Sequence, residues 1–306
     1  MDYEKVQSFG VPADAKPRIM IASDIHWAFK TRYGIYEGNA FDDLIDVIRM
    51  QRPAHLIMLG DLDHGWSQAA WTKLTDLVRT SAIFGNHDNV ELLMDQVNTD
   101  GTSVMPRNGE MRNILGMRFG FMNGIAAKRE RTKDGAPRIT PDRARAALNP
   151  LVKAGTDALC MHESMYYELR SPTSVGDELM RQLLLEWGST APPLILSGHV
   201  SRKPYYVAKC GTNTLGLRVQ TSPQHMSYLT IEPHGDRLEI ALWMRHEKLG
   251  DMSISMRSLR TGSTDAGSLA FMKEGARLLP WPGWILRNGA ASAQQTPDRT
   301  KQRQVA

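Results

Sequence analysis

The sequence predicts an α/β fold in which short buried strands alternate with amphipathic helices. Short, mostly apolar runs recur between residues 18 and 197, as in strands that are buried on both faces. Segments with apolar residues at helical spacing separate most of these runs. Polar residues of a few types, chiefly aspartate and histidine, directly follow five of the runs. This alternation favours a largely parallel sheet that is covered on both sides.

The first half of the chain is predicted to contain three pairs of a strand and a helix. The expected strands are residues 18–23, 56–59 and 81–84. The expected helices are residues 41–51, 67–78 and 90–97. In the first of these helices apolar residues recur at helical spacing, and Pro53 follows its end. We therefore expect the chain to begin with βαβ units.

The second half continues this alternation and then changes to strands alone. We expect strands at 117–122, 158–161 and 194–197, with a helix at 141–153 and another around 179–187. Further strands without intervening helices are expected at about 205–208, 214–219, 226–232 and 238–244. The last two are predicted to form a hairpin that closes a second sheet.

The pattern predicts one main domain with appendages. The main domain is expected to cover residues 17–247 and to follow an irregular N-terminal segment, residues 1–16. Residues 248–289 are rich in Ser, Gly and Met without a clear period, and we interpret them as a C-terminal appendage. Residues 290–306 have the composition of a disordered tail.

Composition restricts the class of protein. The 306 residues are 42% hydrophobic and 23% charged, as in a globular protein, and no apolar run approaches the roughly 20 residues of a membrane helix. The N-terminus has no apolar signal region, so we expect a cytoplasmic protein without a membrane partner. Cys160 and Cys210 are too few for a disulfide framework and are interpreted as structural. A net charge of +4 and the basic segment 128–133 weakly favour an anionic partner.

Seven polar residues at the predicted strand ends are of types that bind metals or transfer protons. They are Asp24, His26, Asp61, Asn86, His87, His162 and His199. Carboxylate oxygens mixed with imidazoles suit divalent ions such as Mn²⁺, Fe²⁺ or Zn²⁺. This many ligands is enough for two ions, provided that one carboxylate bridges them. Asp61, which follows a central strand and a glycine, is the candidate for the bridge.

The motifs at the strand ends resemble those of a known superfamily. They stand in the order Asp24-Ile25-His26, Gly60-Asp61-Leu62-Asp63-His64, Gly85-Asn86-His87-Asp88, His162-Glu163 and Gly198-His199. In order and spacing, and in the strand-like run before each motif, they resemble the calcineurin-like metallophosphoesterase superfamily. The resemblance covers roughly residues 18–245.

The resemblance implies a four-layer α/β/β/α sandwich of two mixed sheets with a dinuclear metal site at the strand ends. It implies two divalent ions, which could be Mn, Fe, Zn or Mg. The implied ligands are Asp24 and His26 for one ion, Asp61 as the bridge, and Asn86, His162 and His199 for the other. In similar enzymes the histidine at the position of His87 assists the leaving group, with Asp88 fixing its orientation.

The implied function is phosphoester hydrolysis. Two such ions can polarise a phosphoryl group and lower the pKa of a shared water, which gives hydroxide for in-line attack. We expect a phosphodiesterase, with a phosphorylated small molecule, a nucleotide or a nucleic acid as its substrate. An alternative is a DNA exo- or endonuclease resembling the nuclease subunit of the double-strand-break repair complex, to which residues 60–64 are locally similar.

One position departs from the pattern of the superfamily. The last motif of the family is Gly-His-x-His, but here it is Gly198-His199-Val200-Ser201. Because a hydroxyl is a much poorer ligand than an imidazole, the first metal site is expected to be weak, to be filled by water, or to be completed by another residue such as His225. A third reading, a non-catalytic scaffold with an incomplete site, rests on Ser201.

Overall fold

The computed structural model describes most of the chain from residue 15 onward. The described residues are 15–32, 35–130, 132–133, 136–163, 174–199, 205–210, 213–223, 225–261, 267–271, 276–278 and 285–286. Ser201, nearly all of the predicted irregular segment 1–16 and the predicted tail 290–306 lie outside these residues. Within the described part of the chain, none of the helices has the length and apolar character needed to span a bilayer.

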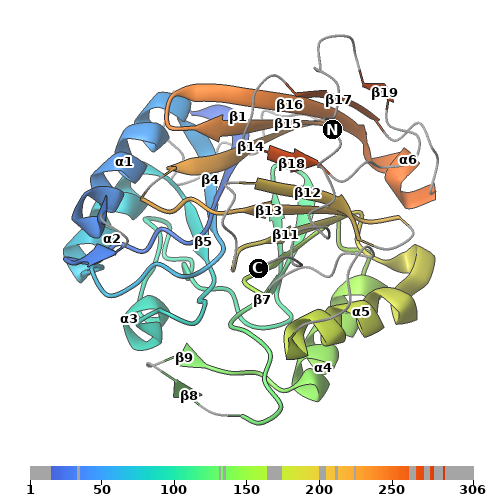
Figure 1. Cartoon of the computed structure of the whole chain (residues 1–306), viewed down its shortest axis with the longest axis horizontal. Coiled ribbons are helices and arrows are strands. Elements are labelled where there is room, and N and C mark those ends of the chain that lie inside the picture. Colours follow the sequence, from blue (N-terminus) through green and yellow to red (C-terminus); the bar gives the residue numbers. More distant parts are fainter. Residues whose placement is uncertain are drawn as a thin grey trace, which may run out of the picture.

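Two mixed β-sheets form the centre of the molecule (Figure 1). The first sheet has the order β19-β17-β16-β15-β14-β1-β4-β5 and the second has the order β18-β12-β13-β11-β10-β7-β6. In the first sheet β1, β4 and β5 are parallel to one another, and β14 joins β1 in antiparallel orientation. In the second sheet β7, β10, β11 and β13 are parallel, with antiparallel strands β6 and β12 beside them.

The strands of the first sheet are β1 (Lys16–Ala22), β4 (Pro53–Met58), β5 (Thr80–Ala82), β14 (Ser227–His234), β15 (Arg237–Met244), β16 (Glu247–Ser255), β17 (Gly267–Phe271) and β19 (Ile285–Leu286). Those of the second sheet are β6 (Met111–Ile114), β7 (Met117–Met122), β10 (Ala158–Met161), β11 (Leu194–Ser197), β12 (Tyr205–Lys209), β13 (Leu215–Val219) and β18 (Ala276–Leu278). Two small hairpins pair β2 (Thr31–Arg32) with β3 (Ile35–Tyr36) and β8 (Thr132–Lys133) with β9 (Ala136–Pro137).

The helices are α1 (Ala40–Gln51), α2 (Gln68–Leu77), α3 (Val90–Met94), α4 (Pro141–Lys153), α5 (Val175–Trp187) and α6 (Met256–Thr261). Single 3₁₀ turns occupy η2 (Glu37–Asn39) and η3 (Gly188–Thr190). Several helix ends follow from local sequence. The side chains of Ser67, Asn89 and Ser174 accept hydrogen bonds from the first turns of α2, α3 and α5, as N-caps do, and Pro141 begins α4.

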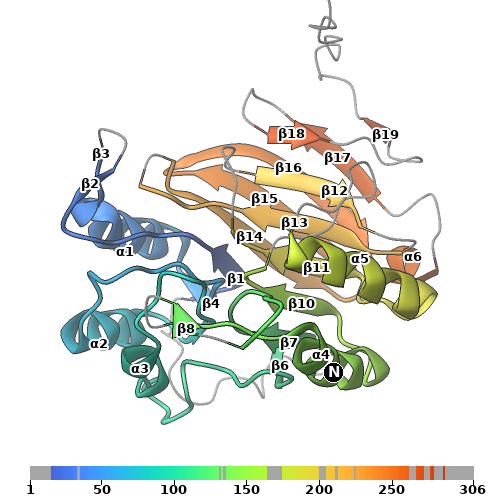
Figure 2. The same cartoon turned by 60° about the horizontal axis from the view of Figure 1, so that its bottom comes forward.

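The alternation of side chains along each strand creates four layers. In β1, Ile19 and Ile21 face the second sheet and join a core that includes Phe119 of β7, whereas Met20 faces the other way, toward a cluster that contains Leu44 of α1. The outer face of the second sheet packs against α4 and α5 in a third cluster. Figure 2 shows these helices beside the second sheet and α1 and α2 beside the first. The predicted four-layer α/β/β/α sandwich is confirmed.

The hairpin of β14 and β15 was predicted to close a second sheet, and this prediction is wrong. β14 pairs with β1, with Ile231 opposite Ile19, so the hairpin extends the first sheet. The strands that the alternation assigned to a single parallel sheet are instead divided between two sheets. Strands in both sheets are buried on two faces, so each is an apolar run in the sequence. An apolar run does not reveal which other strand it will pair with.

Residues 247–255, at the junction of the expected main domain and the expected C-terminal appendage, form β16 along the whole length of β15. Leu249, Met252 and Ile254 are buried in the core between the sheets. The pairing of β15 with β16 shifts register between Leu242 and Trp243, which places an extra residue in β16. This bulge breaks the two-residue period of the apolar positions, and the segment therefore lacked a readable strand pattern.

Candidate metal centre

The polar residues that follow five strands converge at one end of the molecule, from both sheets. β1, β4 and β5 of the first sheet lead into the motifs at Asp24, Asp61 and Asn86, and β10 and β11 of the second sheet lead into His162 and His199. Two groups of possible metal ligands result: Asp24, His26 and Asp61, and Asp61, His162 and His199. Within each group the ligand atoms lie within 4.8 Å of one another. Asp61 belongs to both groups.

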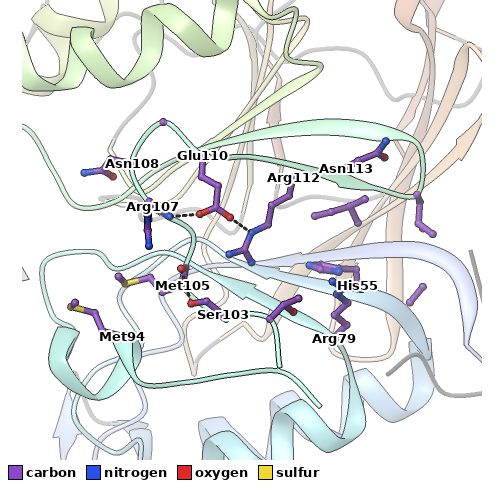
Figure 3. Close-up of a pocket in the computed structure, with 15 residues that line it drawn as sticks. His55, Arg79, Met94, Ser103, Met105, Arg107, Asn108, Glu110, Arg112 and Asn113 are labelled. Atoms are coloured by element: carbon purple, nitrogen blue, oxygen red, sulfur yellow. Dashed lines mark hydrogen bonds and ion pairs between the residues drawn. The ribbon is translucent and has the colours of Figure 1, made fainter. Parts of the chain in front are cut away.

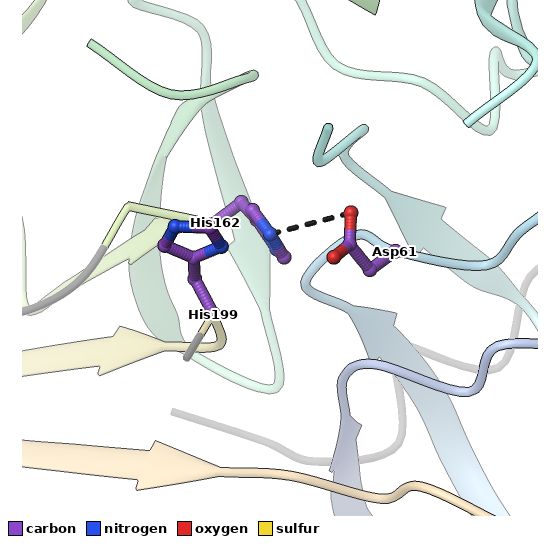
Figure 4. Close-up of side chains that lie close together, drawn as sticks. All are labelled: Asp61, His162 and His199. Carbon is purple, nitrogen blue, oxygen red and sulfur yellow. Dashed lines mark ion pairs between the residues drawn. The ribbon is translucent and has the colours of Figure 1, made fainter. Parts of the chain in front are cut away.

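The two oxygens of Asp61 face different partners. Oδ2 lies 3.8 Å from Nε2 of His26, which is itself 3.9 Å from Oδ1 of Asp24. Oδ1 lies 3.4 Å from Nε2 of His162, as Figure 4 shows, with His199 on the far side of His162. Atoms that are each about 2.1 Å from one ion lie roughly 3–4 Å from one another. The spacing on both sides of Asp61 therefore fits a metal ion.

Unpartnered buried atoms in the centre also fit metal ligands. Oδ1 of Asn86 is buried and accepts no hydrogen bond from the described residues, and Nε2 of His162 makes no hydrogen bond to them either. Nδ1 of His162 lies 2.7 Å from the carbonyl oxygen of Leu59, which fixes the ring with Nε2 toward the centre. Buried polar atoms without a hydrogen bond are unfavourable, and a bound ion would satisfy Oδ1 of Asn86 and Nε2 of His162, the latter lying 3.4 Å from Oδ1 of Asp61.

Burial and the charges of neighbouring groups shift the pKa values of the carboxylates and imidazoles in the centre. Burial raises the pKa of Asp24 above its usual value. Burial of the His162 ring lowers its pKa, but the neighbouring Asp61 carboxylate outweighs this and raises the pKa of His162 to about 10. Burial and the charge of His162 lower the pKa of His199 to about 3. Carboxylates crowded together in a dry site favour a bound cation.

The backbone of the centre is held in an unusual conformation. Nine non-glycine residues of the described chain have a positive φ, and five of these are in the centre. They are Asp24 (57°), His26 (49°), Asp61 (56°), Asp63 (70°) and His199 (58°). Such residues cost roughly 1–3 kcal/mol each and persist where the surroundings hold them, as they often do in functional sites.

Hydrogen bonds from backbone amides hold two of the loops together. Oδ1 of Asp61 accepts hydrogen bonds from the N–H groups of Asn86 (2.7 Å) and His87 (2.9 Å). In return, the carboxylate of Asp88 accepts hydrogen bonds from the N–H groups of Gly85, Asp61, Leu62 and Asp63. A side chain at Gly85 would not fit, because its Cβ would lie 2.7 Å from Cε1 of His162.

Asp88, which is predicted to orient His87, also makes contacts with the backbone. Both of its oxygens accept backbone N–H groups, so the carboxylate holds the loop after β4 against the loop after β5. The ring of His87 lies edge to face against that of His26, with 5.5 Å between ring centroids. His87 thus borders the first group of ligands.

Replacing Asp88 by asparagine is expected to destabilise the protein even without metal. The amide group offers one acceptor oxygen in place of two, so part of the set of four N–H groups would lose its partner, at a cost of about 2–4 kcal/mol. Urea unfolding in EDTA measures this, with the exposed Asp46→Asn in α1 as the control. Equal stability of Asp88→Asn and the wild type would contradict the bracing role.

Two further residues belong to the centre without a predicted role. Asp63 is buried, with Oδ2 3.5 Å from Nδ1 of His26 and 3.1 Å from Nζ of Lys30, so it positions the His26 ring. In the sequence, the position of Asp63 two residues after Asp61 could have indicated this role. Arg218 donates a hydrogen bond from Nη1 to the carbonyl oxygen of His199 (3.4 Å).

His225, the suggested replacement for the missing histidine, is in neither group of ligands among the described residues.

Comparison with known proteins agrees with this geometry. A sequence model of the family described as calcineurin-like phosphoesterase matches residues 17–203. No curated protein matches the chain. The structure of TT1561 from Thermus thermophilus is 12% identical, covers 73% of this chain and 97% of its own, and has a TM-score of 0.52. This likeness shows a shared fold.

Two other solved structures are less similar. An uncharacterised protein from Streptococcus pneumoniae TIGR4, described as a predicted phosphoesterase, is 10% identical, with coverage of 78% and 97% and a TM-score of 0.37. A Vps29 mutant from Entamoeba histolytica is 12% identical, with coverage of 74% and 92% and a TM-score of 0.38.

The family model covers more than half of the chain and every proposed ligand. The chain therefore belongs to the calcineurin-like phosphoesterase family and is a metal-dependent phosphoester hydrolase.

Proposed function

We propose that the chain is a phosphodiesterase that uses two divalent ions and acts on a nucleotide or nucleic-acid substrate. The main support is the position of Asp61, whose two oxygens face two separate groups of ligand atoms. In this proposal Asp24 and His26 would hold one ion, and Asn86, His162 and His199 would hold the other. Asp61 would contribute to both sites.

The proposed mechanism divides the work between the ions and the side chains around them. When bound, the ions would polarise the phosphoryl group and activate water for in-line attack. The amides of Asn86 and His87 hold the bridging carboxylate of Asp61 in one orientation. His87 is proposed to donate a proton to the leaving oxygen, because it borders the first ion's ligands and is only partly buried.

The surroundings of the centre carry groups that suit a nucleotide. Phe29, three residues after His26, is 72% exposed and lies edge to face against Trp27 at 5.8 Å between centroids. Tyr36, in the small hairpin of β2 and β3 that follows Phe29, is 51% exposed. Exposed aromatic rings are suited to stacking with bases, and Phe29 is close in sequence to the proposed ligand His26. Positive charges for a phosphate are close as well, since Arg138 and Arg218 contribute to the low pKa of His199.

The proposed activity is tested with Mn²⁺ and model esters. The purified chain is expected to hydrolyse bis(p-nitrophenyl) phosphate and to prefer it to the monoester p-nitrophenyl phosphate. A preference for the monoester would overturn the diesterase assignment. Absence of turnover with all of Mn²⁺, Fe²⁺, Zn²⁺ and Mg²⁺ would overturn the proposed reaction. For the nuclease alternative, affinity for DNA should fall steeply with salt, because bound phosphates release counterions.

Phe29→Ala tests whether the substrate carries a base. The p-nitrophenyl ester of thymidine monophosphate and methyl p-nitrophenyl phosphate share a leaving group, and only the first has a base. We expect the variant to raise KM for the thymidine ester by about 5- to 150-fold, the equivalent of one stacked base at roughly 1–3 kcal/mol. KM for the methyl ester should not change, and Phe29→Tyr should restore the wild-type value. An equal change for both esters would exclude base stacking at Phe29.

A further inference from the structure

A large cavity lies outside the metal centre, at the seam between the two sheets. It has a volume of about 1020 Å³ and is lined by fifteen residues, none of which is a proposed metal ligand. Its walls come from the start of β4, the segment before β5, residues 102–110 and the edge strand β6 (Figure 3). The parallel strands β4 and β5 begin at this cavity and end at the metal centre, so the two sites lie toward opposite ends of these strands.

Arginines from three separate segments line the cavity. They are Arg79 before β5, Arg107 in the loop before β6, and Arg112 in β6. Two carboxylates balance two of them: Nη2 of Arg79 lies 3.0 Å from Oδ2 of Asp100, and Nε of Arg112 lies 2.7 Å from Oε1 of Glu110. Arg107 is exposed, and no carboxylate of the described residues forms an ion pair with its guanidinium. The lining therefore carries an unbalanced positive charge.

His55, which also lines the cavity, adds no charge of its own. His55 is buried, and burial together with Arg79 and Arg112 lowers the pKa of His55 to about 3. The ring is therefore neutral near pH 7, and its Nε2 lies 2.9 Å from Oγ of Ser81. The charged side chains of the lining are therefore the three arginines and Glu110, which pairs with Arg112.

Arg112 is fixed in place for binding an anion. Nη1 donates to Oγ of Ser81 on β5 (2.9 Å), Nε is held by Glu110, and the guanidinium lies over the ring of Phe121, 5.8 Å from its centroid. Arg112 thus joins the edge of one sheet to the edge of the other. No described residue accepts a hydrogen bond from Nη2, which leaves this nitrogen available. A guanidinium that is held in this way loses little entropy when it binds phosphate.

We propose that this cavity is a second binding site, for a phosphate monoester of mononucleotide size. Arg112 and Arg107 would bind the phosphate, and the side chains of Met94 and Met105, which line one end of the cavity in Figure 3, would contact the organic part. The volume is near the upper end of the roughly 300–1,000 Å³ of small-molecule sites, enough for a ligand of this size. This proposal does not depend on the activity at the metal centre.

Calorimetric titration of the full chain in EDTA tests the site without interference from metal-bound phosphate. The probes are adenosine monophosphate, inorganic phosphate and uncharged adenosine. Adenosine monophosphate is expected to bind to one site, with adenosine at least about tenfold weaker because it makes no charge-assisted hydrogen bonds. Inorganic phosphate that binds as tightly as the nucleotide would contradict a role for the organic part.

Charge reversal distinguishes the cavity from general attraction to a basic protein. Arg107→Glu should weaken binding of adenosine monophosphate by at least about tenfold. Arg143→Glu, at an exposed arginine of α4 outside the cavity, is the matched control and should leave the affinity within about twofold. Equal effects of the two variants, or no saturable binding to the wild type, would overturn the proposal. Arg107→Glu should retain the wild-type rate on bis(p-nitrophenyl) phosphate, so failure here is separable from failure of the proposed function.

Discussion

Replacing Asp61 by asparagine is expected to empty both metal sites and to lower kcat by more than about 10³-fold. The two oxygens of this carboxylate face His26 on one side and His162 on the other, at 3.8 and 3.4 Å. An asparagine offers a single neutral oxygen, which could serve one side at most, and its amide nitrogen would face either His26 or the N–H groups of the loop after β5. Metal content by mass spectrometry and kcat with Mn²⁺ measure the two effects.

Asp24→Asn is the matched variant, because Asp24 faces only one of the two groups of ligands. It should lose one ion and retain the other, whereas Asp61→Asn loses both. If the two variants lose the same number of ions, Asp61 does not bridge. Urea unfolding of both variants in EDTA shows whether the loss of metal follows from unfolding.

The second large effect is expected from His87→Ala. Loss of a proton donor beside the leaving group typically lowers the rate by about 10²- to 10⁴-fold. The loss should be largest for alkyl leaving groups, which need a proton, and smaller for p-nitrophenolate, which leaves readily as an anion. Metal content should equal that of the wild type, because His87 is not a proposed ligand.

His64→Ala is the control for this variant, since His64 is exposed and also follows β4 and Asp61 in the chain. It should retain the wild-type rate. A uniform loss for His87→Ala across all leaving groups would show that the ring does not donate the proton. Loss of an ion in His87→Ala would instead make His87 a ligand.

The strand ends of the centre could be predicted because each motif directly follows a short apolar run. β7, β10 and β11 have the predicted bounds, and β1, β4 and β5 differ from them by a few residues at their ends. In a parallel arrangement such ends meet at one edge, which is why Asp24, Asp61 and His162 were expected together although more than 130 residues separate the first from the last.

The division of the strands between two sheets was not predictable from the same pattern. A strand that is buried on both faces is apolar in either sheet, so β1 gave no sign that it would pair with β14. The bulge opposite Leu242 concealed β16 for a different reason, since it moved the apolar residues of β16 out of alternation. Pairing and register depend on the assembled sheet.

The side-chain roles in the centre were also only partly predictable. Adjacency in the sequence suggested that Asp88 orients His87, but it gave no sign that the carboxylate accepts hydrogen bonds from four backbone amides. The left-handed backbone at Asp24, His26 and Asp61 likewise results from tertiary contacts, because aspartate and histidine only weakly favour that conformation.

The position of the ions relative to Asp61 is the most direct test of a two-ion centre. Crystals of the chain grown with Mn²⁺ give anomalous difference density at each bound ion. A two-ion centre should give two peaks about 3.5–4 Å apart, one on each side of the Asp61 carboxylate. A single peak, or two peaks of which only one contacts Asp61, would contradict it.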